Sequence, residues 1–327
     1  MTAEPRVSVL ITAHNAAGTI GPSLRSIAAQ ASAGRVEVIL VDDRSTDGTS
    51  EAARAAGIEE LRILRVDQPS NSGLTTRQDA LALGIRAARG DVVLTTDADG
   101  IAAPDWIASM SAPILAGRAD AVAGPVVFRA ARGWLGVWQT VDVAYYLLLC
   151  SLLNAFGFAG GVLFGNFAFR RELFDAVGGF ERIGFTLTED LAFSRALKAH
   201  GSRIRYSGRG GVEVGACESW VALVERAKRV SSGGLSALSL SLGVWMALLP
   251  LLALLALVFG SVFGWLLLTR YAAGAAFSAM SLARVGRFSL LPAALLYEPL
   301  AIVIGLRVMA RLARNSQVEW GGKSYAR

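Results

Sequence analysis

Cysteine is scarce in this chain, which has only Cys150 and Cys217 among its 327 residues. Two isolated cysteines are too few for a disulfide framework or a structural zinc site. There is also no Gly-x-Gly-x-x-Gly after the first predicted strand and no Gly-x-x-x-x-Gly-Lys-Ser/Thr loop, which argues against a dinucleotide dehydrogenase and a P-loop enzyme. The sequence has neither a nucleic-acid-binding motif nor an internal repeat, and we expect no nucleic-acid partner.

Charge is absent from one long stretch near the C-terminus. Leu235 to Leu268 include no Asp, Glu, Lys or Arg, and Phe288 to Leu306 include only Glu298. About 20 apolar residues suffice to cross a bilayer, and the chain as a whole is 53% hydrophobic with a mean hydropathy of +0.46. We therefore expect a transmembrane region at residues 235–310, with spans near 243–267 and 288–306.

Basic residues predict how this region is oriented. No secretory signal precedes the first predicted strand, so we expect residues 1–234 to form a cytoplasmic domain. Two spans return the basic tail at 311–327 to the same side, as the positive-inside rule prefers. Three spans would place Arg270 in the membrane, at a cost of about 2.5–3.5 kcal/mol. The sequence thus predicts a multi-pass protein of the inner cell membrane, in contact with anionic lipid, in which Glu298 pairs with an arginine or faces the cytoplasmic domain.

Apolar strands alternate with helices over the first hundred residues. Short apolar runs bounded by turn formers are typical of buried parallel strands, and their alternation with helices indicates βαβ units. We expect an α/β fold with a mostly parallel, doubly wound sheet. The predicted strands are Val7–Ala13, Val36–Val41, Leu61–Val66 and Asp91–Thr96, and the predicted helices are Thr19–Gln30, Thr49–Ala56 (capped by Ser45, Thr46 or Asp47) and Ser72 or Thr75 to Arg89.

Two of these strands end in pairs of carboxylates. Asp42 and Asp43 follow the second strand, and Asp97 and Asp99 follow the fourth. Ligands in open α/β sheets bind at the carboxyl ends of strands, where such groups converge. Two acidic side chains repel each other unless a cation lies between them, and Mg²⁺ is typically held by one or two carboxylates plus substrate phosphates. The alternative for Asp97 and Asp99 is an Asx turn or a helix cap.

Further motifs follow in order along the chain. The whole set comprises Val7 to Asn15, Val-Asp-Asp-x-Ser-Thr-Asp-Gly-Thr at 41–49, Thr-Asp-Ala-Asp at 96–99, Gly165 to Glu172, Val-Gly-Gly-Phe at 177–180, Thr188-Glu189-Asp190 and Arg226 to Val230. It resembles family 2 glycosyltransferases of the Rossmann-like GT-A fold over about the first 235 residues. One departure is Val230, which stands where the family's Gln/Arg-x-x-Arg-Trp element has tryptophan.

The resemblance implies a binding site for a nucleotide-sugar donor. Thr12 and His14 would lie against the nucleotide. Asp43 would accept hydrogen bonds from the base, which is uracil in the best-known relatives, with Asp42 beside it. Arg77 would face the nucleotide or its diphosphate.

The same resemblance assigns the reacting groups. Asp97 would contact the ribose, and Asp99, with Asp97 beside it, would hold the Mg²⁺ or Mn²⁺ ion that bridges the two phosphates. Asp190 matches the family's catalytic base, which takes the proton of the attacking hydroxyl. Arg226 and Arg229 would add positive charge near the diphosphate. With one base and no carboxylate nucleophile, the resemblance implies the family's reaction, a single inverting displacement.

Simpler explanations exist for several of these residues. His14 also suits a polar strand end, and Glu189-Asp190 suits the first turn of a helix, where acidic charge favours the helix dipole. The basic residues between Arg226 and Arg229 also suit a position next to the membrane, where each is attracted to anionic lipid by about 1 kcal/mol. The segment Trp134 to Leu163, rich in aromatic residues, suits either ordinary core or an interfacial helix or apolar acceptor surface.

These features together predict a membrane-anchored, metal-dependent, inverting glycosyltransferase of the hexosyltransferase class. Its donor would be a nucleotide sugar, in particular a UDP-sugar, and its acceptor a hydroxyl on a lipid-linked or apolar molecule. One alternative is a polyprenyl-phosphate glycosyltransferase, although such enzymes usually follow Asp-x-Asp with further acidic or Pro-rich residues, and this chain has Gly100-Ile101. Another alternative is a non-catalytic, nucleotide-binding membrane scaffold.

Overall fold

The computed structural model describes residues 6–30, 36–68, 72–129, 133–231, 237–314, 318–320 and 323–325. The chain divides into two compact units. Unit 1 comprises Met1–Arg129 and Tyr146–Gly215, and unit 2 comprises Ala130–Tyr145 and Ala216–Arg327. The last segment of unit 1 therefore ends before the predicted domain limit at residue 234. As a functional division, the limits 1–234 and 235–310 stay a prediction.

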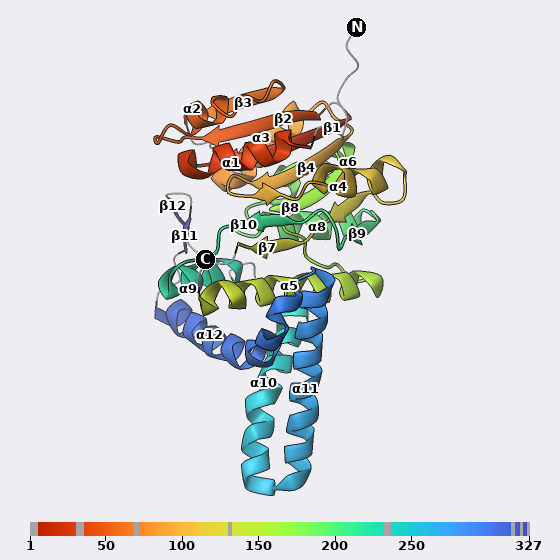
Figure 1. Cartoon of the computed structure of the whole chain (residues 1–327), viewed down its shortest axis with the longest axis vertical. Coiled ribbons are helices and arrows are strands. Elements are labelled where there is room, and N and C mark those ends of the chain that lie inside the picture. Colours follow the sequence, from red (N-terminus) through yellow and green to blue (C-terminus); the bar gives the residue numbers. More distant parts are fainter. Residues whose placement is uncertain are drawn as a thin grey trace. The chain divides into compact units, whose positions relative to one another are not determined.

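A seven-stranded sheet in the order β3-β2-β1-β4-β8-β6-β9 forms the centre of unit 1 (Figure 1). The first four strands in this order are parallel, as predicted, whereas β8 runs antiparallel to both β4 and β6. A small second sheet has the order β5-β10-β7. The strands are β1 (Val7–Ala13), β2 (Val36–Asp43), β3 (Leu61–Val66), β4 (Val92–Asp97), β5 (Ile101–Ala102), β6 (Ala121–Ala123), β7 (Val126–Phe128), β8 (Asn166–Arg170), β9 (Ile204–Tyr206) and β10 (Val212–Val214).

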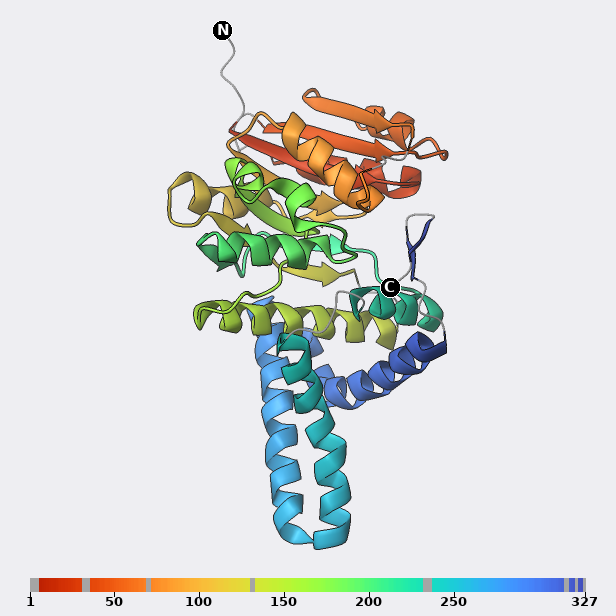
Figure 2. The same ribbon diagram turned by 180° about the vertical axis from the view of Figure 1, so that it is seen from behind.

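Helices cover both faces of the large sheet. Helix α1 lies on the face seen in Figure 1, and α3 lies on the face seen in Figure 2. Thr75 and Gln78 form a capping box at the start of α3, which confirms Thr75 as one of the two predicted starting points. The helices of unit 1 are α1 (Ala17–Ala28), α2 (Thr49–Arg54), α3 (Thr76–Ala87), α4 (Trp106–Leu115), α6 (Glu172–Ala176), α7 (Gly179–Ile183) and α8 (Glu189–Ala199), while α5 (Trp134–Ala155) contributes to both units.

The main core of unit 1 lies between the sheet and α3, α6, α7 and α8. Aliphatic residues of β1, β2 and β4, such as Leu10, Ile39 and Val93, are fully buried against this layer. Strands that are buried on both faces need such continuous apolar runs. Phenylalanine rings complete the cluster, many in tilted or edge-to-face contact, at Phe164, Phe167, Phe169, Phe174, Phe180 and Phe193.

Unit 2 contains the long apolar helices. Helices α10 and α11 lie side by side as a hairpin that turns at Gly260, and α12 is directed away from the hairpin axis (Figures 1 and 2). Four helices among the described residues are long and apolar enough to cross a membrane, namely Trp134–Ala155, Leu240–Phe259, Ser261–Arg284 and Phe288–Arg311. The elements are α9 (Trp220–Ser231), α10 (Ala237–Phe259), α11 (Ser261–Arg284), the 3-10 helix η2 (Phe288–Ala293), α12 (Ala294–Arg314), β11 (Val318–Trp320) and β12 (Lys323–Tyr325).

The prediction of a single span at 243–267 is wrong. Helix α10 ends at Phe259, Gly260 has a φ of 83°, and α11 begins at Ser261. Glycine adopts this left-handed conformation without strain, so it permits the turn. The apolar run continues through the turn without a charged residue, and hydropathy alone does not reveal the break. The second predicted span, 288–306, lies in η2 and α12.

A buried ion pair joins α10, α11 and α12. The Nη1 atom of Arg270 lies 2.7 Å from Oε2 of Glu298, and both residues are buried. The indole nitrogen of Trp245 donates to the other carboxylate oxygen at 3.0 Å, and the Arg270 guanidinium lies 3.5 Å from the centre of the same indole. At Gly274 a side chain would collide with the Glu298 carboxylate. The prediction that Glu298 pairs with an arginine is confirmed, and Arg270 is not left as an isolated charge.

We predict that Gly84→Ala destabilises unit 1 by about 1–3 kcal/mol, because overpacking a closed core has this cost. A Cβ atom at Gly84 would lie 2.2 Å from Cδ1 of Leu10, which is fully buried. Thermal unfolding of the detergent-solubilised chain measures the effect. The matched control is Gly18→Ala in α1, where no atom lies within 4 Å of the added carbon. Equal unfolding temperatures for the two variants would contradict the close packing of α3 on the sheet.

Candidate functional site

The predicted polar residues lie at one edge of the large sheet. Strand β1 lies between β2 and β4, so that Thr12 is opposite Asp97 on one side and Ala13 is opposite Asp42 on the other. Neighbouring strands are about 4.8 Å apart, which puts the ends of β2 and β4 about 10 Å from each other. The carboxyl ends of these parallel strands therefore bring Thr12, Asp42, Asp43 and Asp97 to one region, as expected for a ligand site.

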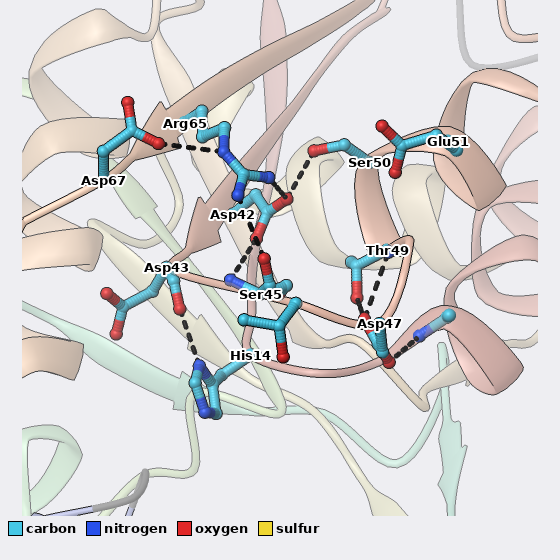
Figure 3. A network of polar contacts seen from close by, with 12 residues as sticks. His14, Asp42, Asp43, Ser45, Asp47, Thr49, Ser50, Glu51, Arg65 and Asp67 are labelled. Atoms are coloured by element: carbon cyan, nitrogen blue, oxygen red, sulfur yellow. Dashed lines mark hydrogen bonds and ion pairs between the residues drawn. The ribbon is translucent and has the colours of Figure 1, made fainter.

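The loops that follow β1 and β2 are bonded to each other (Figure 3). The Nδ1 atom of His14 lies 2.7 Å from the backbone oxygen of Asp43, so this ring nitrogen carries the proton and donates. The backbone nitrogen of Asn15 donates to Oγ of Ser45 at 2.9 Å. Asn15 and Arg44 have φ values of 52° and 58°, a left-handed conformation that is rare outside glycine. The two loops thus hold each other in a strained conformation, of the kind that clusters at functional sites.

Asp47 connects the first turns of two helices. One of its carboxylate oxygens accepts from the backbone nitrogen of Ala17 at 3.0 Å, and the other accepts from the backbone nitrogen and hydroxyl of Thr49. Hydrogen bonding from Thr49, then from Ala17, holds the pKa of Asp47 below its ordinary value. The N-cap position of α2 itself is occupied by Gly48. Asp47 therefore satisfies orphan N–H groups of both α1 and α2, a wider role than the predicted cap.

Asp42 is fully buried and bonded within the protein (Figure 3). Its carboxylate accepts from the backbone nitrogen of Ser45 at 3.1 Å, from the hydroxyl of Ser50 and from Nη1 of Arg65 at 3.1 Å. Burial alone would raise its pKa, but the hydrogen bonds from Ser45 and Ser50 hold the pKa of Asp42 below its ordinary value. These contacts make Asp42 the group that fixes the loop after β2. Its predicted contact with the donor stays a prediction.

Asp43 is the neighbouring carboxylate and also has a cationic partner. Nε and Nη2 of Arg44 donate to its two oxygens at 2.7 and 3.1 Å. Arg44 directly follows Asp43, so the strained backbone at Arg44 accompanies this contact. The result is an acidic group held at the strand end beside His14, where the nucleotide base was predicted to bind.

Arg77 joins the fourth strand to the start of α8. Its Nη2 atom donates to Oδ1 of Asp97 at 2.7 Å, and its Nε atom lies 2.8 Å from Oε1 of Glu189, a residue that is 4% exposed. Burial would lower the pKa of Arg77, but Asp97, Glu189 and Asp190 together raise it above its ordinary value. The structure thus gathers Arg77, Asp97 and Asp190, which are far apart in sequence. Glu189 was not predicted to bind donor or metal, because its contact with Arg77 depends on the tertiary fold.

Asp99 lies beyond the end of β4, beside β10. Its Oδ2 atom accepts from the backbone nitrogen of Gly215 at 2.9 Å, and Arg129 donates to its backbone oxygen at 2.8 Å. Burial, followed by repulsion from Asp97, raises the pKa of Asp99 above its ordinary value. At Gly165, on the other side of the pair, a Cβ atom would lie 2.8 Å from Oδ2 of Asp97. The backbone therefore approaches the carboxylates closely, and glycine is the residue that permits this.

Two carboxylates form the candidate metal site. The described part of the chain has no group of three or more His, Cys, Asp or Glu residues that would hold a metal. Asp97 and Asp99 repel each other, and a divalent cation relieves that repulsion. Ions such as Mg²⁺ are often bound by only one or two carboxylates together with substrate phosphates. The pair therefore fits a cation that binds together with a diphosphate.

Asp190 lies in the first turn of α8. Its Oδ1 atom accepts from the backbone nitrogen of Leu191 at 2.8 Å, a contact that also agrees with the helix-dipole explanation of this residue. Its electrostatic contact with Arg77 places it in the same group as Asp97. The role of Asp190 as a base stays a prediction, while its position beside the strand-end carboxylates is a feature of the structure.

Gln78 fixes the segment that leads to Asp190, although none of the sequence motifs includes Gln78. Its side-chain nitrogen donates to the backbone oxygen of Gly184 at 2.9 Å, and its side-chain oxygen accepts from the backbone nitrogen of Thr186 at 3.3 Å. Gln78 is fully buried. The only sequence signal was the Thr-x-x-Gln pattern of a capping box at Thr75, which reveals the local bond but not the contact more than 100 residues away.

Arg226 and Arg229 belong to α9 in unit 2. Nη1 of Arg226 donates to Oε1 of Gln139 at 3.3 Å within that unit. The predicted contact of both arginines with a diphosphate stays a prediction. Lys228 on the same helix is only 3% exposed and lies 3.9 Å from Glu225. The explanation of these basic residues by a position next to the membrane stays a prediction.

Known proteins resemble this chain in sequence and in fold. The family model described as glycosyl transferase family 2 matches residues 8–178. An N-acetylglucosaminyltransferase of Azorhizobium caulinodans is 30% identical over 148 residues, 44% of this chain and 36% of its own length. An undecaprenyl-phosphate 4-deoxy-4-formamido-L-arabinose transferase of Aeromonas hydrophila is 35% identical over 96 residues, 28% of each chain. The matched regions thus span about a third of these curated relatives.

One solved structure resembles nearly the whole chain. It is the mannosyltransferase PcManGT from Pyrobaculum calidifontis in complex with GDP-Man and Mn²⁺, with a TM-score of 0.53. The likeness covers 91% of this chain and 88% of that one at 22% sequence identity. At this identity it is evidence for the fold alone.

We predict that Gln78→Ala loosens the segment 184–190 and leaves the strands unchanged. Loss of two buried hydrogen bonds, each worth about 1 kcal/mol, raises local opening roughly thirtyfold. Hydrogen exchange with peptide mass analysis measures it. The control is Arg86→Gln, which removes an exposed contact of the same helix with Glu181 at 2.7 Å. Unchanged exchange at 184–190 in Gln78→Ala would contradict the positioning role.

Proposed function

This chain belongs to glycosyl transferase family 2 and has the GT-A fold, and we propose that it transfers a sugar from a UDP-sugar to a hydroxyl of a lipid-linked or apolar acceptor at the inner cell membrane. The observation that carries the proposal is the grouping of Arg77 with Asp97, Glu189 and Asp190. It joins the strand end that would bind the donor to the helix that would supply the base.

The donor binds across the ends of β1, β2 and β4. Asp43 accepts hydrogen bonds from the base, and Thr12 and His14 lie against the nucleotide. Asp42, fixed by Ser45 and Ser50, holds the loop that carries Asp43. In this proposal Asp42 acts on the donor through its neighbour.

The diphosphate lies beside Asp97, Asp99 and Arg77. Asp99, with Asp97, holds a Mg²⁺ or Mn²⁺ ion, which when bound offsets the negative charge that grows on the departing diphosphate. Arg77 is already oriented by two carboxylates and adds positive charge at the same place. A preorganised cation of this kind stabilises the developing charge without reorganisation. Arg226 and Arg229 would add to this charge.

Asp190 takes the proton of the attacking hydroxyl. A positioned carboxylate contributes a factor of about 10²–10⁴ as a general base. Glu189 is tied to Arg77, and Gln78 fixes the backbone at Gly184 and Thr186, so both ends of the segment leading to Asp190 are held. Asp190 does not act as a nucleophile and forms no bond to the sugar. The transfer is a single displacement that inverts the configuration at the anomeric carbon.

A lipid-linked acceptor agrees with the relative from Aeromonas hydrophila, whose name describes transfer onto undecaprenyl phosphate. A polyprenyl-phosphate glycosyltransferase therefore remains the alternative that this comparison favours. It differs from the main proposal in that the acceptor oxygen belongs to a phosphate instead of an alcohol. A non-catalytic scaffold would have no use for a partly buried cluster in which one arginine faces three carboxylates, and this disfavours the scaffold.

The membrane anchor in this proposal is the hairpin of α10 and α11. Leu240–Phe259 is about 30 Å long at 1.5 Å per residue, the thickness of the hydrocarbon core. Within unit 2, Arg311 of α12 lies 2.6 Å from Glu225 of α9, and the Arg307 guanidinium lies 4.9 Å from the ring centre of Trp220. Helix α9 precedes the hairpin and α12 follows it. Their contact supports two crossings, with the basic end of α12 on the cytoplasmic side.

We predict that Asp99→Asn lowers Mn²⁺-dependent UDP binding at least tenfold, because one of two metal ligands loses its charge. Asp190→Asn should keep UDP binding within about twofold and lower transfer by about 10²–10⁴. Calorimetry measures binding, and mass analysis of products from UDP-sugars and a membrane lipid extract measures transfer. Asp91→Asn, at the opposite, exposed end of the same strand segment, is the control. Wild-type turnover in both site variants would end the assignment.

We predict that a cysteine at Val262, beside the hairpin turn, reacts with a membrane-impermeant maleimide in intact cells. A cysteine at Met309 in α12 should react only after the membrane is opened. Both side chains are 67% exposed, and the native Cys150 and Cys217 are replaced by Ala and Ser. Labelling of both positions from the same side, or of neither, would contradict two crossings.

A further inference from the structure

The end of α5 in unit 1 carries three exposed apolar side chains. Leu152, Phe156 and Phe158 are 38%, 78% and 64% exposed. We call these residues the aromatic tip. Unit 1 buries its other phenylalanines in the core, apart from Phe185. The exposure of the aromatic tip is therefore unusual within this unit, and packing within the unit does not explain it.

The aromatic tip is held by a defined turn. The backbone nitrogen of Phe158 donates to the oxygen of Leu153 at 2.9 Å, and that of Gly157 donates to the oxygen of Asn154 at 3.1 Å. Gly157 has a φ of 88°. These two bonds and a left-handed glycine form the Schellman motif. In this motif the residue after the glycine, here Phe158, commonly packs back onto the last turn of the helix. Here Phe158 is mostly exposed, so the turn presents it outward.

Contacts to β9 and α8 fix the turn on unit 1. The side-chain nitrogen of Asn154 donates to the backbone oxygen of Ile204 at 2.8 Å, and Nζ of Lys198 donates to the side-chain oxygen of Asn154 at 3.4 Å. Side chains four and three residues apart share a helix face. Leu191, Arg195 and Lys198 therefore form one face of α8, and Leu191 reaches the loop after the tip, 3.3 Å from the Cβ position of Gly161. Two basic residues thus accompany the tip.

We propose that the aromatic tip inserts into the headgroup region of an anionic bilayer. Aromatic rings concentrate at this level of a membrane, and basic side chains beside them are attracted to anionic lipid. The inference rests on the proposed membrane anchor, because the α10 segment Leu240–Phe259, none of which is buried, brings the chain to a bilayer. The tip gives unit 1 its own contact with that bilayer.

Contact of the aromatic tip with the bilayer bears on the proposed function through the position of Asp190. Helix α8 begins with Glu189 and Asp190 and carries Lys198 near its other end. The separation of eight positions between Asp190 and Lys198 corresponds to about 12 Å along the helix. The base is therefore close to the lipid surface when the tip is inserted, within reach of an acceptor whose apolar part stays in the membrane.

An environment-sensitive fluorophore on a cysteine at Phe158 tests the proposal. The full-length chain, with Cys150 and Cys217 replaced, is reconstituted in nanodiscs of phosphatidylcholine with or without phosphatidylglycerol. The expected result is a blue-shifted emission and roughly fivefold weaker iodide quenching than for a label at Leu83, an exposed residue of α3. A label at Leu257, which is 85% exposed on α10, reports the anchor.

The three labels separate the possible failures. A Phe158 label as aqueous as the Leu83 label, beside an apolar Leu257 label, overturns the aromatic tip and leaves the anchor standing. An aqueous Leu257 label overturns the anchor and the tip with it. A Phe158 label that becomes apolar only when a lipid-linked acceptor is added overturns membrane insertion in favour of acceptor binding.

Charge reversal provides the second measurement. Lys198→Glu and Arg195→Glu should each raise iodide quenching of the Phe158 label at least about fivefold in nanodiscs that contain phosphatidylglycerol. Loss of one basic charge near an anionic surface accounts for a factor of that size, and the new carboxylate is repelled by the same surface. Arg54→Glu on α2, where the arginine is exposed, is the control. Equal quenching in Lys198→Glu and Arg54→Glu would overturn the anionic preference.

Discussion

The site depends on one arginine among three carboxylates. Arg77 comes from α3, Asp97 from the end of β4, and Glu189 and Asp190 from the start of α8. Without the guanidinium these carboxylates would repel one another in a partly buried place, although Phe193 and Leu197 would still pack α8 against the sheet. Because Arg77 is bonded to both Asp97 and Glu189, it connects the strand end proposed to receive the donor to the helix proposed to present the base. The same end of α3 also contacts the segment before Asp190. There Gln78, which forms the capping box with Thr75, donates a hydrogen bond to the backbone oxygen of Gly184.

A second set of contacts, independent of Arg77, fixes the loops on the other side of β1. Asn15 after β1 is bonded to Ser45 after β2, and Asp47 is bonded to the start of α1 at Ala17. The buried Asp42 holds the loop after β2 through Ser45. The left-handed conformations of Asn15 and Arg44 persist because these bonds offset their cost. The two sides of the candidate site are therefore built by different means, one by loop-to-loop hydrogen bonds and the other by ion pairs.

Local patterns in the sequence predicted the first half of the fold well. The strands at Val7–Ala13 and Leu61–Val66 match at both ends, because apolar runs between turn formers leave few alternatives. The strand-end position of Asp97 followed from the same pattern. Contacts between distant elements were not predictable in this way. The burial of Asp42, the bond between Gln78 and Gly184, and the contact of Arg77 with Glu189 appear only when the chain is folded. Gly260 was missed for another reason, since an apolar helix and an apolar turn have the same hydropathy.

The ion pair between Arg270 and Glu298 has a consequence for biosynthesis. The two residues are 28 positions apart, and Glu298 lies on the later helix. When α11 leaves the ribosome, Arg270 has no counter-ion, and an uncompensated arginine disfavours partition into lipid. In the proposed membrane anchor, α12 therefore supplies the counter-ion that α11 lacks, and the last helix favours insertion of the two before it.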